Sequence, residues 1–102
     1  MSTDDYSQWW LATLGRTVIW ARLRVRDAGT AEVFDSDGNT LPYDSEDSAR
    51  AALMDAEFTA IDGMDQDDAD ARGFTLRELT PPQADDDTKL RALMVQKLPT
   101  RH

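Results

Sequence analysis

The chain has 102 residues, 40% of them hydrophobic and 30% charged, a composition that predicts one folded domain with a single core and excludes a disordered chain. Its formal net charge is −9 and it has no cysteine, which excludes disulfides and thiolate metal sites and favours a cytoplasmic location. The amino terminus starts with acids, and no apolar run reaches the roughly 20 residues that span a bilayer, so we expect neither a signal peptide nor a membrane span.

The first predicted element is a helix that begins at Thr3 or Asp4 as its cap and ends near Leu14, where Gly15 can stop it. Acids in its first turn would suit the positive end of the helix dipole. The apolar side of this helix would include Tyr6, Trp9, Trp10 and Leu14.

Residues 17–26 predict a strand, because β-branched and aromatic residues lead into a strict alternation. One face would hold Ile19, Ala21, Leu23 and Val25, and the other Val18, Trp20, Arg22, Arg24 and Arg26. A three-residue turn over 27–29, with Gly29 left-handed, would start a hairpin to residues 31–34. That register sets Arg22 opposite Phe34 and Leu23 opposite Val33, and it allows an ion pair between Arg24 and Glu32.

Residues 35–46, DSDGNTLPYDSE, have the acid spacing of a calcium-binding loop but not its glycine. Such a loop needs glycine at position 6, which here is Thr40, whereas Asp37-Gly38 between two strands is a strong hairpin signal. We therefore interpret the segment as a two-residue turn, which would place Phe34 on the same face as Leu41 and Tyr43.

Two helices and a strand should follow. The first is capped by Asp44 or Ser45 and buries an alanine-rich stripe of Ala49, Ala52, Leu53 and Ala56. The second is short, begins at Asp65 as cap with Met64 and Ala69 as a staple, and ends at Arg72. Residues 74–79, FTLREL, predict a last strand before Pro81-Pro82.

We predict an α+β domain over residues 1–82, with an antiparallel sheet of three to four strands and two hairpins packed with two helices. An acidic linker and an amphipathic tail helix would form residues 83–102. The tail helix could dock on the domain or bind a partner, and we favour a loosely attached one. Its apolar residues are Leu90, Leu93, Met94 and Leu98.

Charge is unevenly distributed along the chain. Residues 35–72 hold twelve acids against two bases, a net charge of −10, while the segments on either side are nearly neutral. A localised negative field attracts basic surfaces and repels nucleic acid. The leading hypothesis is a non-enzymatic module, regulatory or inhibitory, that binds a basic protein through Glu46, Asp47, Asp62, Asp65, Asp67, Asp68 and Asp70.

Three alternatives remain open. An assembly or scaffold component could bind through the tail helix or the Trp9-Trp10 pair. A nucleic-acid binder could use the face with Trp20 and its arginines, and a small enzyme could use carboxylates. We expect no enzyme, cofactor or metal, because the only histidine is the terminal His102 and common nucleophile-base pairs cannot be assembled. No family is recognised from these motifs.

Overall fold

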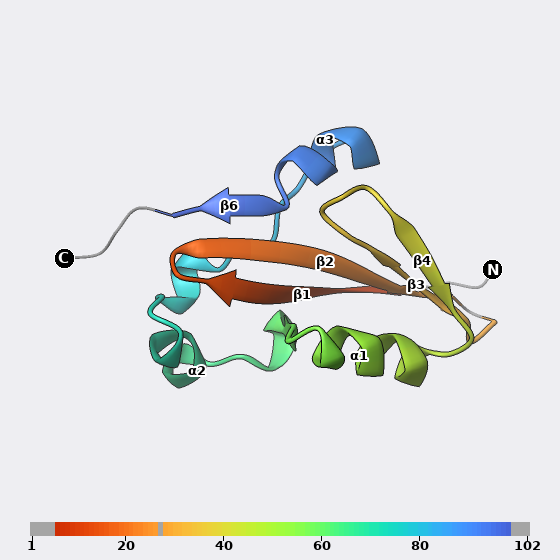
Figure 1. Cartoon of the computed structure of the whole chain (residues 1–102), viewed down its shortest axis with the longest axis horizontal. Helices are drawn as coiled ribbons and strands as arrows, with labels where there is room; N and C mark the ends of the chain where they lie inside the picture. The colour runs from red at the N-terminus through yellow and green to blue at the C-terminus, as the bar shows by residue number, and fades with distance from the viewer. Residues whose placement is uncertain (1–5, 27, 99–102) are drawn as a thin grey trace.

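The computed structural model describes residues 6–26 and 28–98, which form an α+β fold with a six-stranded antiparallel sheet and three α-helices (Figure 1). The strands are β1 (Tyr6–Leu14), β2 (Thr17–Val25), β3 (Ala31–Phe34), β4 (Thr40–Tyr43), β5 (Thr59–Ala60) and β6 (Val95–Lys97). The helices are α1 (Glu46–Asp55), α2 (Gln66–Ala71) and α3 (Asp87–Ala92), with 3₁₀ turns η1 (Ile61–Gly63) and η2 (Leu76–Glu78). The sheet order is β4-β3-β2-β1-β5, and β6 also pairs with β2.

The predicted N-terminal helix is wrong, because residues 6–14 form strand β1; its proposed caps lie outside the described residues. β1 pairs with β2 along its whole length, from Tyr6 opposite Val25 to Leu14 opposite Thr17. Gly15, expected to end a helix, instead takes a positive φ of 60° in the turn between the strands. Neighbouring side chains on a strand point to opposite faces, so β1 can supply apolar groups to both sides of the sheet.

The β2–β3 hairpin confirms the predicted register: Arg22 pairs with Phe34, Leu23 with Val33 and Arg24 with Glu32. Gly29 has the expected positive φ, at 92°. The ion pair differs, since Glu32 contacts Arg26 rather than Arg24. Arg24 belongs to β2 and Arg26 directly follows it, two residues closer to the turn, and it is Arg26 that reaches the carboxylate.

The β3–β4 connection is a hairpin, but its loop is one residue longer than predicted. Phe34 pairs with Thr40 and Val33 with Leu41, so Leu41 does not share the face of Phe34. One Asp35 carboxylate oxygen accepts hydrogen bonds from the backbone N–H groups of Asp37 and Asn39, each at 3.0 Å. These bonds stabilise the longer loop, in which Gly38 takes the positive φ of 88°.

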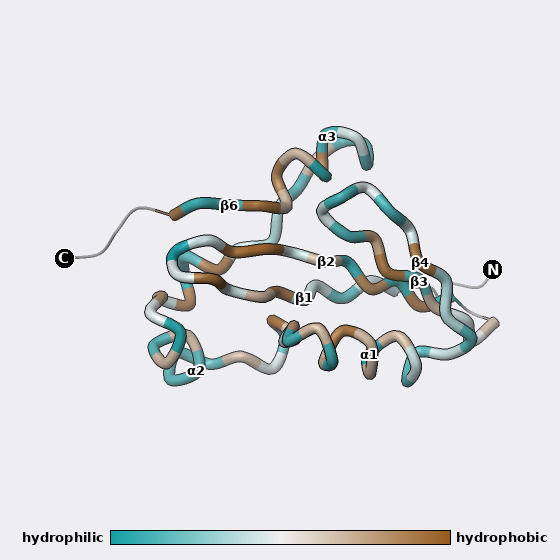
Figure 2. Tube along the Cα trace, viewed as in Figure 1, coloured by the Kyte–Doolittle hydropathy of each residue, from teal (hydrophilic) through white to brown (hydrophobic). Residues whose placement is uncertain are grey.

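Apolar residues form a core on each face of the sheet. The first core lies under α1 and contains Trp10, Ala21, Leu23, Val25, Ala31, Val33, Ala49 and Leu53. The second is covered by the C-terminal half of the chain and contains Leu11, Val18, Trp20, Phe34, Met64, Ala69, Phe74, Leu79, Leu90 and Met94. In Figure 2 much of β2 and β3 is brown, whereas the tip of the β3–β4 hairpin is teal.

The predicted strand over residues 74–79 is also wrong, since its centre is the 3₁₀ turn η2. Thr75 and Glu78 form a capping box there, each side chain bonding the other's backbone N–H. Phe74 and Leu79 are both buried in the second core. Both side chains enter the core from a loop. The apolar residues of segment 74–79 are therefore buried without being part of a paired strand.

The tail helix is shorter than predicted, and the tail packs on the sheet. After α3 the chain becomes β6, which pairs with residues 17–19 of β2. The backbone N–H of Trp20 donates to the carbonyl of Met94 at 2.8 Å, and its indole Nε1 donates to Gln96 at 3.0 Å. Leu90 and Met94 belong to the second core. The expected loose attachment does not agree with these contacts.

Candidate partner-binding surface

The predicted acidic residues are brought to one long side of the molecule. The described chain is elongated, with extents of 49 × 27 × 25 Å, and α1, η1 and α2 follow its lower side in Figure 1, away from α3 and β6. We call residues 44–72 the acidic side; they carry ten acids against two bases, a net charge of −8. Its acids are Asp44, Glu46, Asp47, Asp55, Glu57, Asp62, Asp65, Asp67, Asp68 and Asp70, all of them exposed except the half-buried Glu46.

The two bases of the acidic side are turned toward the rest of the fold. Arg50 lies over the Trp10 ring, 5.2 Å from its centroid, and donates to Gln8 Oε1 at 2.9 Å. Arg72 donates to the Thr59 hydroxyl at 2.8 Å. Both side chains are half-buried, so the exposed charged groups of this side are mainly its carboxylates.

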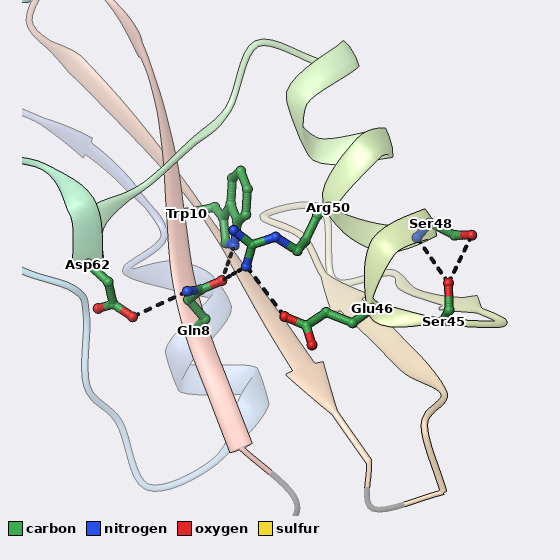
Figure 3. A network of polar contacts seen from close by, with 7 residues as sticks. All are labelled: Gln8, Trp10, Ser45, Glu46, Ser48, Arg50 and Asp62. Atoms are coloured by element: carbon green, nitrogen blue, oxygen red, sulfur yellow. Dashed lines mark hydrogen bonds and ion pairs between the residues drawn. The ribbon is translucent and has the colours of Figure 1, made fainter.

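A polar network centred on Gln8 joins β1 to α1 and η1 (Figure 3). The side-chain oxygen of Gln8, which accepts from Arg50, also accepts a hydrogen bond from the Trp10 indole at 3.0 Å. The side-chain nitrogen of Gln8 donates to Asp62 at 3.3 Å. Arg50 completes the network through an ion pair with Glu46 at 3.4 Å. The network fixes how the acidic side sits against the edge of the sheet.

Tyr6 extends this network from the start of β1. A hydrogen bond to the Glu46 carboxylate, desolvation and the negative charge of Glu46 raise the pKa of the Tyr6 hydroxyl, while the positive charge of Arg50 opposes them. The neutral phenol is the donor in that bond, so loss of its proton is disfavoured. Neither Tyr6 nor Gln8 was singled out as a site residue from sequence, because their roles depend on a helix forty residues away.

Some of the predicted acids form hydrogen bonds within the fold, and others form none among the described residues. Asp65 caps α2 and forms a capping box with Asp68, and Asp70 accepts from Gln66 at 2.7 Å. Asp47 and Asp67 form no side-chain hydrogen bond or ion pair with the part of the chain that the structure describes. Each lies in the first turn of its helix, α1 or α2, where a negative charge interacts favourably with the positive end of the helix dipole. These two carboxylates are therefore open to a partner.

The residues of the apolar alternative are mostly committed to the core. Trp10, Leu90 and Met94 are buried. Trp9 and Leu98 are half-buried and pack against the second core, where Trp9 meets Trp20 edge to face at 6.1 Å. Leu93 alone of this set is exposed, at 44%.

The arginine-bearing face of β2 is also partly occupied. Trp20, predicted as a possible stacking residue, is fully buried. Arg22 lies over Phe34 at 5.1 Å and pairs with Asp87 at 3.3 Å, so α3 covers its guanidinium. Two of the groups that suggested nucleic-acid stacking thus have partners inside the fold.

Neither a metal cluster nor a membrane span is found in the described part of the chain. No three His, Cys, Asp or Glu side chains of residues 6–26 and 28–98 are grouped so that they could hold a metal ion. Among the same residues, every helix is too short or too polar to traverse a bilayer. Comparison with protein-family models, curated proteins and solved structures finds no match to this chain.

Proposed function

We propose that the protein is a non-enzymatic interaction module, regulatory or inhibitory, that binds a basic protein surface through its acidic side. The observation that carries this proposal is the asymmetry of residues 44–72, where nine acids are exposed and both arginines are engaged with the fold. Solubility requires net charge, but it does not require that the charge be concentrated on one side of the molecule.

Physical chemistry links this asymmetry to association. Ten carboxylates along one side of an elongated molecule produce a negative potential that speeds encounter with a basic surface and disfavours acidic partners. Exposed charges separated by more than about 8 Å are largely screened at physiological ionic strength, so such binding weakens as salt is raised. The burial of most of the apolar alternative set supports folding as the role of those residues.

The experiment is a pull-down from nuclease-treated native extract, washed at about 50 and then about 300 mM salt. The test variant is Asp47→Asn with Asp67→Asn, which removes two charges that bond nothing in the described chain. The control, Asp37→Asn with Asp85→Asn, changes the net charge equally, from the tip of the β3–β4 hairpin and the approach to α3. We expect a partner that the high-salt wash releases and that the test variant loses but the control retains.

Two results would contradict the proposal. A partner that stays bound through the high-salt wash would show that exposed charge does not hold the complex. Equal losses in the two variants would show that net charge, rather than the acidic side, determines binding.

A further inference from the structure

An apolar groove lies between α1 and the β3–β4 hairpin, with a volume of about 150 Å³. Its helical wall includes Ala52 and Ala56, and its floor includes Ala21. These small side chains leave space where the helix meets the sheet. An apolar cavity of about this size accommodates a benzene-sized group, which corresponds to one large apolar side chain.

The groove is lined mainly by hydrophobic residues and opens to solvent. Val33 and Tyr43 come from the hairpin, and Phe58 follows the end of α1. Leu41, another lining residue, is 44% exposed although it is a large aliphatic side chain. A partner that covered the groove would remove this apolar surface from water, which is the main favourable term in most protein associations.

The charged residues that line the groove or flank its lining in sequence at the end of α1 are acidic. Among the described residues, Asp35 is the one charged residue that lines it, and none of its lining residues is basic. Asp55 and Glu57 flank the lining residue Ala56 in sequence. The C-terminal end of α1 is itself the negative end of a helix dipole, and its last turn carries no basic residue to offset it. The surroundings therefore favour a cationic occupant.

A second hollow, between α1 and the edge of the sheet at β5, differs in this respect. It is lined by Trp10 and Met54 but also by Arg50, whose guanidinium lies over the Trp10 ring. A basic partner segment would meet a fixed positive charge there. Charge complementarity thus selects the groove beside the hairpin.

We infer that this groove receives a single large apolar side chain, such as Leu or Phe, from a basic segment of the partner protein. The flanking Lys or Arg residues of that segment contact the acidic rim, which we define as Asp35, Asp55 and Glu57. The inference rests on the proposed function and adds the chemistry of the partner to it. A second copy of this chain would bring a like-charged rim to the groove, so repulsion disfavours it as occupant.

The test uses two synthetic peptides with the same lysines and arginines, one with Leu-Phe at its centre and one with Ser-Ser. Binding to the full chain is measured by calorimetry, and contact is mapped through methyl NMR shifts of Leu41 and Leu53. The groove-filling variant is Ala56→Leu. Its control is Ala51→Leu, because Ala51 is an exposed alanine of α1 that does not line the groove.

We expect the Leu-Phe peptide to bind about 10- to 100-fold more tightly than the Ser-Ser peptide, the ratio that corresponds to burying one large apolar side chain. Ala56→Leu should reduce this ratio to near one and leave the weak binding of the Ser-Ser peptide unchanged. Ala51→Leu should preserve the ratio. The methyl shifts should move for Leu41 and Leu53 and stay fixed for Leu76, which packs against the second core on the other face of the sheet.

The contrary outcomes separate the two proposals. Equal, salt-sensitive binding of both peptides would overturn the groove and leave the acidic side standing. Binding of neither peptide would overturn both. A concentration-dependent dimer that Ala56→Leu dissociates would assign the groove to a second copy of the chain and would also overturn this inference.

Discussion

Glu57 occupies a backbone position that usually belongs to glycine. It has a positive φ of 68°, the one such non-glycine residue in the described chain. Its N–H bonds the carbonyl of Met54 and that of Phe58 bonds the carbonyl of Leu53, which is the hydrogen-bond pattern of a helix ending in a left-handed residue. A side chain in this conformation costs about 1–2 kcal/mol, and a carboxylate at the negative end of α1 adds to the cost.

We therefore expect Glu57→Gly to stabilise the fold by about 0.5–1 kcal/mol, because relief of strain exceeds the extra chain entropy of glycine in the unfolded state. Urea unfolding would measure the change. Glu57→Ala removes the same charge and keeps the Cβ atom, so it should stabilise less. If alanine stabilises as much as glycine, charge rather than backbone strain sets the cost at this position.

Tyr6 provides a pH-dependent test of the network at the sheet edge. Its folded pKa lies above the ordinary tyrosine value of 10.0 because of the bond to Glu46. The contribution of the protonated Tyr6 hydroxyl to the free energy of unfolding is therefore complete below the unfolded pKa. It is lost as pH rises through the folded pKa. Glu46→Gln should lower the Tyr6 pKa, as followed by phenolate absorbance, with Tyr6→Phe identifying the signal. An unchanged titration in Glu46→Gln would show that this bond is not formed.

At the scale of elements, the tail is structural. Leu90 of α3 and Met94, which directly precedes β6, belong to the second core, and β6 extends the sheet beside β2. A truncation of residues 83–102 would therefore remove core side chains and strand hydrogen bonds together. Loss of association on truncation would not identify a binding helix, and point substitutions in the tail are the sharper probe.

Met94→Ala should destabilise the protein by about 2–5 kcal/mol, as expected for truncating a fully buried side chain. Leu93→Ala, one residue earlier and 44% exposed, should change the free energy of unfolding by much less. Chemical denaturation of the two variants gives the comparison. Similar small effects would mean that the tail is only loosely attached, as the sequence alone suggested.

At the scale of the whole molecule, charge opposes the compact state. A net charge of −9, concentrated on the acidic side, gives self-repulsion that salt can screen. The ion pairs between described residues, such as Arg22–Asp87 and Arg26–Glu32, are partly exposed, so screening them costs little by comparison.

We accordingly expect the thermal midpoint to rise as sodium chloride is increased from about 50 to about 500 mM. The rise should be smaller in Asp47→Asn with Asp67→Asn than in Asp37→Asn with Asp85→Asn, because only the first pair lies on the acidic side. A midpoint that falls with salt would show that favourable ion pairs outweigh the repulsion.

Local chemistry made part of the fold predictable. The turn at Gly29 and the alternation of β2 set the β2–β3 register, and Ser45 and Asp65 cap α1 and α2 as expected. The β3–β4 turn was located correctly but its length was not, because the bonds made by the Asp35 side chain compete with the two-residue form. Capping and turn preferences act over a few residues, so one sequence is enough to read them.

The sequence by itself determined where the negative charge lies along the chain, which segments turn, and where the two middle helices begin. Only the tertiary structure decided that residues 6–14 are a strand, that the tail joins the core, that Arg50 and Arg72 turn inward, and that a groove opens beside α1. Each of these features depends on contacts between residues distant in sequence, whose pairing energies outweigh the weak local preferences that a sequence displays.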